Sequence, residues 1–329
     1  MKVLPATASM AWLSRFVEDV RIVVPVAGRA FQLERLPDGR TTLVFRVIED
    51  GRQGDVTVAG PRTRALFKNA TGVARVVILQ FKPGWSTPLL GVAANALTDR
   101  IVLLEDIWGR PGGDLCRELL EAASLPEVLD RLSRAIATRT HRTFEPASAR
   151  LARRAVRLFE RDEVRVESVA ERLGVTARHL RRAFTESVGI GPKDFARTVR
   201  LQRAVRMAST SKDWVRIAAD AGYYDQAHLI SDFRELVGLT PGAFRGVRFG
   251  SGAAEAAVTP AFDCSINTAR GDRPMPRGDM RRRTSSDQKS GVFAVELDQE
   301  SIEKAANGSI GRWKLECTPR LDGMTKRGA

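Results

Sequence analysis

The stretch GVTARHLRRAF, Gly174–Phe184, returns in altered form as GYYDQAHLISDF, Gly222–Phe233, and this repetition decides the fold of the second half of the chain. When residues 169–195 are aligned with residues 217–244, the matching pairs are Ala170 with Ala218, Gly174 with Gly222, Leu180 with Leu229, Phe184 with Phe233, Gly189 with Gly238 and Pro192 with Pro241. The offset grows from 48 to 49 residues within the aligned turn because the second copy has one residue more there. The sequence therefore predicts two copies of one supersecondary unit.

Each copy has the order of signals that is typical of a helix-turn-helix. A short helix ends at a glycine, a tight turn follows, and a second helix opens at a capping residue, which is Thr176 in the first copy and Asp225 in the second. Glycine adopts the left-handed conformation of such a turn without a Cβ penalty. In a helix-turn-helix the second helix enters the major groove of DNA. We therefore predict recognition helices at about 177–187 and 226–236.

The outward residues at the start of each second helix are the candidate DNA contacts. Arginine can grip guanine O6 and N7 or a phosphate, glutamine suits adenine, and alanine can touch a thymine methyl group. The first copy carries three arginines on this face and the second carries none, so the first copy is expected to contribute more affinity. The predicted DNA-binding set, with the two caps, is Arg178, Arg181, Arg182, Gln226, Ala227, Ser231, Thr176 and Asp225.

A long helix is expected to join the two copies over residues 193–210. Its apolar positions recur at helical spacing and predict a buried stripe, formed by Leu201, Ala204, Val205 and Ala208. The same helix carries a row of arginines, Arg197, Arg200, Arg203 and Arg206, for which DNA contact and a solvated helix face are equally supported. Residues 150–249 hold 20 Lys or Arg and 12 Asp or Glu, which favours binding to a DNA backbone.

The whole chain is basic. Its 329 residues include 53 Lys or Arg against 39 Asp or Glu, a formal net charge of +14. This charge favours a polyanionic partner, with a solvated arginine-rich surface as the alternative. The three cysteines are far apart, which fits neither a disulfide framework nor a zinc motif. With no apolar stretch near the ~18 residues of a membrane span, a soluble cytoplasmic protein is expected.

Composition divides the remaining chain into regions of different character. Residues 20–85 contain β-branched runs separated by turn signals, and residues 105–142 have the spacing of a helix pair. We predict an α+β two-domain protein. Its parts are a β-rich domain, a small sandwich or barrel, with a helical extension at 1–142, a linker at 143–149, an all-α DNA-binding domain with two helix-turn-helix units at 150–249, and a largely disordered tail at 250–329.

An enzyme is the competing class for the N-terminal region. A metal-dependent cupin needs several histidine or carboxylate ligands that converge in the β-domain, yet the first histidine of the chain is His141, in the helical part. No metal, no cofactor and no catalytic residue is therefore predicted. The alternative function that remains is a cupin-like small-molecule-binding protein or enzyme whose basic surface binds polyanions without specificity. Trp85 and Trp108 are expected to pack in a core or an interface.

The stretch AADAGYYDQAHLISDFRELVGLTPGAFR, Ala218–Arg245, resembles the second-unit signature of the AraC/XylS family of transcription regulators. The resemblance covers about 100 residues from Ala149 to Phe249, and Ser231 stands where family members often carry a basic residue. It implies two recognition helices roughly 34 Å apart on one face of the DNA. The stretches LPDGRTTLVF, LQFKPGWSTPLLGV and LTDRIVLLEDIWG are similar to a poorly characterised cupin-like domain of one subgroup, which implies that residues 1–142 form a sensing or dimerisation domain. The partners implied are double-stranded DNA, RNA polymerase, a small-molecule effector and a second copy of the chain.

Overall fold

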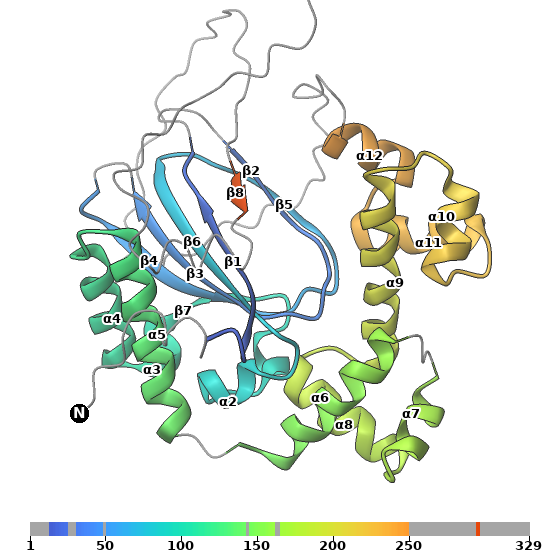
Figure 1. Cartoon of the computed structure of the whole chain (residues 1–329), viewed down its shortest axis with the longest axis horizontal. Helices are drawn as coiled ribbons and strands as arrows, with labels where there is room; N and C mark the ends of the chain where they lie inside the picture. The colour runs from blue at the N-terminus through green and yellow to red at the C-terminus, as the bar shows by residue number, and fades with distance from the viewer. Residues whose placement is uncertain are drawn as a thin grey trace, which may run out of the picture.

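The computed structural model describes residues 13–25, 31–48, 51–142, 145–161, 165–249 and 294–296. The tail that was predicted to be disordered, 250–329, lies outside these residues except for three that form a short strand. Figure 1 shows a β-rich region and a helical region side by side, with one long helix connecting the lower and upper parts of the helical region.

Two antiparallel sheets form the N-terminal region. The larger has the strand order β7-β4-β3-β6-β1-β8, and the smaller pairs β2 with β5. The strands are β1 (Val17–Val23), β2 (Phe31–Arg35), β3 (Thr42–Ile48), β4 (Gly54–Ala59), β5 (Leu66–Ala70), β6 (Val73–Phe81), β7 (Ile101–Leu103) and β8 (Ala294–Glu296). The strands from β1 to β6 confirm the strand-rich stretch that the β-branched runs predict. Strand β1 lies between β6 and the edge strand β8, and it pairs with β8 in the register Ile22 to Val295.

Side chains that alternate along β3 show how the two faces of the large sheet are covered. Leu43, Phe45 and Val47 of β3 are buried in the main N-terminal core, which also includes residues of the helices that follow β7. The residues between them point to the opposite face, where Val44 packs with Val76 and Ile78. Helices thus cover one face of this sheet, and a smaller apolar cluster lies on the other.

The helices of the N-terminal region follow the strands. They are α2 (Ser86–Leu90), the 3-10 helix η1 (Ala94–Leu97), α3 (Leu104–Trp108), α4 (Arg110–Leu120) and α5 (Leu125–Arg142). The helix pair predicted over 105–142 is present as α4 and α5, and an additional short helix, α3, precedes it and is separated from α4 by Gly109 with φ of 67°. Trp108 is buried and its indole N–H donates to Leu90 O at 3.2 Å, which confirms its packing role.

The C-terminal region is helical throughout its described residues. Its helices are α6 (Ala147–Glu160), α7 (Val166–Arg172), α8 (Ala177–Val188), α9 (Pro192–Ala208), α10 (Trp214–Ala221), α11 (Gln226–Val237) and α12 (Pro241–Phe249). Helix α6 begins at Ala147, three residues before the predicted start of the DNA-binding domain at residue 150, since Pro146 with φ of −62° opens the helix and Ala149 is already buried. The fold class predicted from the sequence, a β-rich region followed by two helix-turn-helix units, is confirmed.

Each helix-turn-helix unit has its own aromatic core. In the first, the rings of Phe159, Phe184 and Phe195 meet edge to face, with centroids 5.3–6.4 Å apart. In the second, Phe233 contacts Trp214 and Phe244 at 5.9 and 5.7 Å. The bridging stripe is buried as predicted: the exposed fractions of Leu201, Ala204, Val205 and Ala208 are 5% or less. Across the described ranges, no helix is both long and apolar enough to cross a membrane.

Candidate nucleic-acid interface

Four glycines shape the two units as the repeat predicts. Gly174 and Gly222, in the turns between the paired helices, have φ of 68° and 87°, and Gly189 and Gly238, at the ends of the second helices, have φ of 91° and 80°. These values lie in the left-handed region, where a side chain is strained. Both second helices therefore begin and end at equivalent places in the two copies.

The predicted capping residues open the second helices. Thr176 Oγ1 accepts a hydrogen bond from His179 N at 3.2 Å, and Asp225 Oδ1 accepts one from His228 N at 2.7 Å. Each satisfies an amide that the first turn of a helix leaves without a partner. The capping role of both residues is thus confirmed, while their place in a DNA interface stays a prediction.

Helix α8 separates a buried face from an exposed one. Leu180, Phe184 and Val188 are at most 1% exposed, whereas the predicted contacts Arg178, Arg181 and Arg182 are all exposed. The arginines lie at i, i+3 and i+4, so one face of the helix presents all three. A shallow hollow runs along this face, lined by Arg181, Arg182, Thr185, Glu186 and, from the N-terminal region, Asn95.

Arg181 has a partner in the absence of DNA. Its Nη2 donates to Glu167 Oε1 at 2.5 Å, and the two side chains are 54% and 69% exposed. An exposed ion pair of this kind contributes about 0–1 kcal/mol. Arg181 can therefore exchange Glu167 for a base edge or a phosphate at little cost, and until then Glu167 on α7 holds its guanidinium beside the outer face of the unit.

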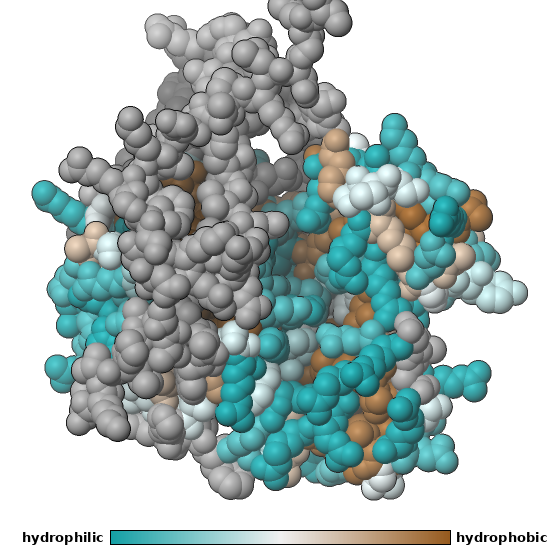
Figure 2. All heavy atoms as spheres, in the orientation of Figure 1, coloured by the Kyte–Doolittle hydropathy of each residue, from teal (hydrophilic) through white to brown (hydrophobic). Residues whose placement is uncertain are grey.

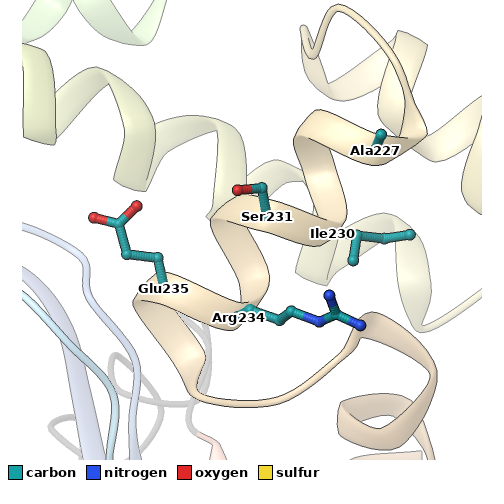
Figure 3. A pocket seen from close by; sticks show the side chains of 5 residues that line it. All are labelled: Ala227, Ile230, Ser231, Arg234 and Glu235. Atoms are coloured by element: carbon teal, nitrogen blue, oxygen red, sulfur yellow. The ribbon is translucent and has the colours of Figure 1, made fainter.

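The outer face of α11 is chemically different. Ala227 and Ser231 are exposed as predicted, and Gln226 is half-buried. A second shallow hollow is lined by Ala227, Ile230, Ser231, Arg234 and Glu235, and Figure 3 shows Ile230 and Arg234 projecting on the same side of the helix. This face offers apolar surface and one cation where α8 offers three arginines.

The structure adds residues that the sequence reasoning did not include. With the offset of 49, the hollow residues Arg181, Arg182, Thr185 and Glu186 of α8 correspond to Ile230, Ser231, Arg234 and Glu235 of α11. The two hollows are therefore equivalent surfaces of the two copies. Ile230 and Arg234 follow Ala227 at i+3 and i+7, so helical spacing was the signal that could have found them. Arg234 also supplies a cation one turn after Ser231.

Three of the four arginines in the bridging helix α9 contact other parts of the protein. Arg197 pairs with Asp232 and Glu235 of α11, with Nη2 distances of 2.8 and 2.6 Å. Arg200 lies 5.4 Å from the ring centre of Tyr223, and Arg203 donates to Glu160 O at 2.6 Å. Arg206 is exposed. Neither interpretation stated for this row, DNA contact or a solvated face, describes Arg197, Arg200 and Arg203 in the structure, because each of them contacts another part of the fold.

The Arg197 cluster fixes α11 against α9. Asp232 is buried with a side chain 5% exposed, and Arg200 Nη2 lies 3.9 Å from its Oδ2. Hydrogen bonds to Glu235 and Asp232 raise the pKa of Arg197, and the bond from Arg197 lowers the pKa of Glu235. Burial raises the pKa of Tyr223, and nearby Asp232 adds to the shift. The second recognition helix is therefore held to the bridging helix by charge as well as by packing.

Hydrophilic residues predominate on the visible side of the helical region (Figure 2). Figure 2 shows the viewer's side of this region as largely hydrophilic, with hydrophobic residues visible as narrow strips. Within the described residues, no group of three or more His, Cys, Asp or Glu side chains is placed to hold a metal ion. The geometry offers two helix faces of equivalent position for a polyanion.

Both units also contact the N-terminal region. Arg153 of α6 lies 3.7 Å from the ring centre of Trp85 and donates to Gly84 O at 3.3 Å, which confirms an interface role for that tryptophan. Burial lowers the pKa of Arg153 to about 10. At the other unit, Arg248 of α12 forms an ion pair with Glu34 of β2. The helical region is therefore packed against the β-rich region at both ends.

Comparison with known proteins identifies both regions. A family described as a helix-turn-helix domain matches residues 169–246, and a family described as a domain of unknown function, DUF6597, matches residues 8–103. The HTH-type transcriptional regulator ArgR of Pseudomonas aeruginosa is 32% identical over 95 residues, a stretch that spans 29% of this chain and 29% of ArgR.

Similar solved structures include an AraC-type transcriptional regulator from Chromobacterium violaceum, with 29% identity over 32% of this chain and 97% of that one, at a TM-score of 0.30. The C-terminal domain of the response regulator AraT from Geobacillus stearothermophilus is 25% identical over 34% of this chain and 96% of that one, also at 0.30. ToxT from Vibrio cholerae is 10% identical over 70% of this chain and 98% of that one, at 0.38.

The matched family and this geometry define residues 169–246 as a helix-turn-helix domain, and the 32% identical relative ArgR is an HTH-type transcriptional regulator. The chain thus carries a helix-turn-helix domain and, before it, a region that matches DUF6597. The resemblance stated from the signature around Gly222 is thereby confirmed.

Proposed function

We propose that the chain is a sequence-specific transcription regulator that inserts α8 and α11 into two adjacent major-groove segments of one DNA duplex. The observation that carries the proposal is the equivalence of the two outer faces. Both begin at a capped N-terminus, both are opposite a buried Leu–Phe pair, and both hollows are formed by corresponding residues. Two probes of the same shape on one rigid connector suit two successive grooves of a regular helix.

The two faces are proposed to read DNA in different ways. Arg178, Arg181 and Arg182 suit guanine edges and phosphates, and they supply the larger share of affinity. On the second helix Ala227 and Ile230 suit thymine methyl groups, and Gln226 suits adenine. Specificity at the second segment therefore comes mainly from contact and shape, and its affinity depends less on salt.

The N-terminal domain is proposed to sense an effector or to form the dimer, and the regulator is proposed to act as a homodimer with RNA polymerase as a further partner. Its docking on both units supports a sensing role, because a change in the β-rich region would reach α6 and α12 through Trp85 and Glu34. The proposed division keeps the domains at 1–142 and 150–249, with α6 reaching back to Ala147.

Selection of duplexes from a random-sequence pool by the full chain tests the proposal. The selected duplexes should bind about 10³-fold or more tightly than random DNA at physiological salt. Replacement of Arg181 by Ala should cost about 1–3 kcal/mol on the selected duplex and relax one base preference. Arg110→Ala removes the same charge from α4, where the side chain is 89% exposed, and is the matched control. Binding that depends on charge alone would show no selected sequence and equal losses on every duplex.

A further inference from the structure

Two loops of the N-terminal region form one unit beside the recognition helices. They are residues 60–65 and 94–100, called the bracket below. Asp99, with φ of 58°, joins them: its Oδ1 accepts from Thr63 N at 2.9 Å, its Oδ2 from Thr63 Oγ1 at 2.5 Å, and its own N–H donates to Pro61 O at 2.9 Å. Arg62 Nη1 donates to Asp99 O at 3.2 Å. Both carboxylate oxygens of Asp99 are thus occupied within the bracket.

One side of the bracket is attached to the end of α8. Thr98 Oγ1 donates to Gly189 O at 2.6 Å. A Cβ on Gly189 would lie 2.9 Å from Ala94 O, so the backbones approach as closely as glycine permits. Asn95 is exposed and lines the outer hollow of α8 together with Arg181 and Arg182.

The other side of the bracket is attached to the end of α11. Ala65 N donates to Leu236 O at 2.7 Å, near the end of that helix. Arg64 is close enough to Glu235, a residue of the second hollow, to lower the pKa of its carboxyl group, after the larger effect of Arg197. The bracket therefore contacts the C-terminal ends of both recognition helices.

The outward charge of the bracket is positive. Arg62 is held by Asp99 and its side chain is only 15% exposed. Arg64 and Arg100 are exposed, and among the described residues neither forms an ion pair. An exposed guanidinium that forms no ion pair, at the edge of a DNA-binding face, is suited to bind a phosphate oxygen.

We propose that the bracket is a third DNA-contacting element, in which Arg64 and Arg100 bind phosphates of the operator backbone beside the two recognition helices. The inference rests on the proposed function. A helix that enters the major groove by its N-terminal residues leaves the groove toward its C-terminal end, where the sugar-phosphate backbone passes. The bracket is attached at that end of both helices. The N-terminal domain thus adds sequence-independent contacts that fix the register of the reading helices.

The test compares the full chain with the Arg64→Ala/Arg100→Ala double variant on a selected duplex and on a random duplex of equal length, over a range of salt. Each lost phosphate contact should reduce the slope of log affinity against log salt by about 0.9, so the double variant should be shallower by about 1.8. Affinity should fall by the same factor on both duplexes, because phosphates carry no sequence information.

Matched variants separate this effect from a general loss of charge. Arg64→Lys/Arg100→Lys should keep the slope, since lysine also binds phosphate, and Arg110→Ala should leave it unchanged. The proposal is overturned if the double alanine variant and Arg110→Ala have the same salt slope, or if the double variant binds more tightly than the unaltered chain. In either case the unaltered chain would still prefer the selected duplex. If the unaltered chain bound the selected and the random duplex equally, the proposed function itself would be refuted.

Discussion

Replacement of Asp232 by Ala should loosen the second recognition helix far more than replacement of Glu235, although both carboxylates bind the same arginine. Arg197 approaches Asp232 through Nε at 3.2 Å and Nη2 at 2.8 Å, and Glu235 through Nη1 at 3.1 Å and Nη2 at 2.6 Å. The distances are similar, but the side chain of Asp232 is 5% exposed and that of Glu235 is 53% exposed. Burial is therefore the main difference between the two pairs, and Asp232 also has Arg200 Nη2 at 3.9 Å.

The expected magnitudes follow from that difference. Removal of one member of a buried pair costs about 3–5 kcal/mol because the other charge stays buried without compensation. Arg197 keeps Glu235 in the Asp232→Ala variant, so the lower end, about 3 kcal/mol, is expected. Glu235→Ala removes a solvent-screened pair and should cost under about 1 kcal/mol.

Hydrogen exchange of the α11 backbone amides, followed by mass spectrometry, measures both costs in the full chain. A loss of 3 kcal/mol corresponds to a rise of about 150-fold in the opening constant, and 1 kcal/mol to about fivefold. Amides of β3 should exchange at the rate of the unaltered chain in both variants, since β3 belongs to a separate core. The reasoning is refuted if the two variants lose equal protection, or if Asp232→Ala exchanges less than fivefold faster.

Two further predictions use matched positions of the repeat. Gly238→Ala should cost about 1–2 kcal/mol from left-handed backbone strain alone, since nothing lies within 4 Å of the added Cβ. Gly189→Ala should have the same strain and should also separate α8 from the bracket. Limited proteolysis should therefore cut only the Gly189 variant between the two regions. Thr176→Ala and Asp225→Ala should each lower stability by about 1 kcal/mol in thermal unfolding. Asp225→Asn keeps an acceptor oxygen and should be close to neutral. If Asp225→Asn lost as much stability as Asp225→Ala, the effect would come from the charge of Asp225 and not from its hydrogen bond.

Local features of the helical half could be predicted from the sequence. The four turn glycines, the caps Thr176 and Asp225 and the stripe around Leu201 depend on residues a few positions apart, and spacing reports such relations directly. The short helix α3, which Gly109 separates from α4, was not predicted, because five residues are too few to show a helical spacing. The first turn of α6 was missed because Pro146 suggests a linker as readily as a helix start.

Contacts between distant parts of the chain could not be predicted in this way. The partner of Arg197 is 35 residues away, and Thr98 and Gly189 are 91 residues apart. Nothing in the pattern around Arg197 distinguishes it from Arg206, which is exposed, because the difference lies in what α11 places opposite each one. The candidate site was therefore predicted as two helix faces, and the bracket that joins them emerged only from the fold.

The two recognition helices have the same internal packing and differ in the residues that face outward. Leu180 and Leu229 are both 0% exposed, so the internal packing of the two copies is the same at this position. The outward pair Arg182 and Ser231 is exposed in both copies and is not constrained by packing in this way, because substitutions at exposed positions of a helix change stability by only about 0.5 kcal/mol. A difference that the fold does not require needs another cause. Within the proposed function that cause is the DNA: the copies differ where each meets its own groove segment.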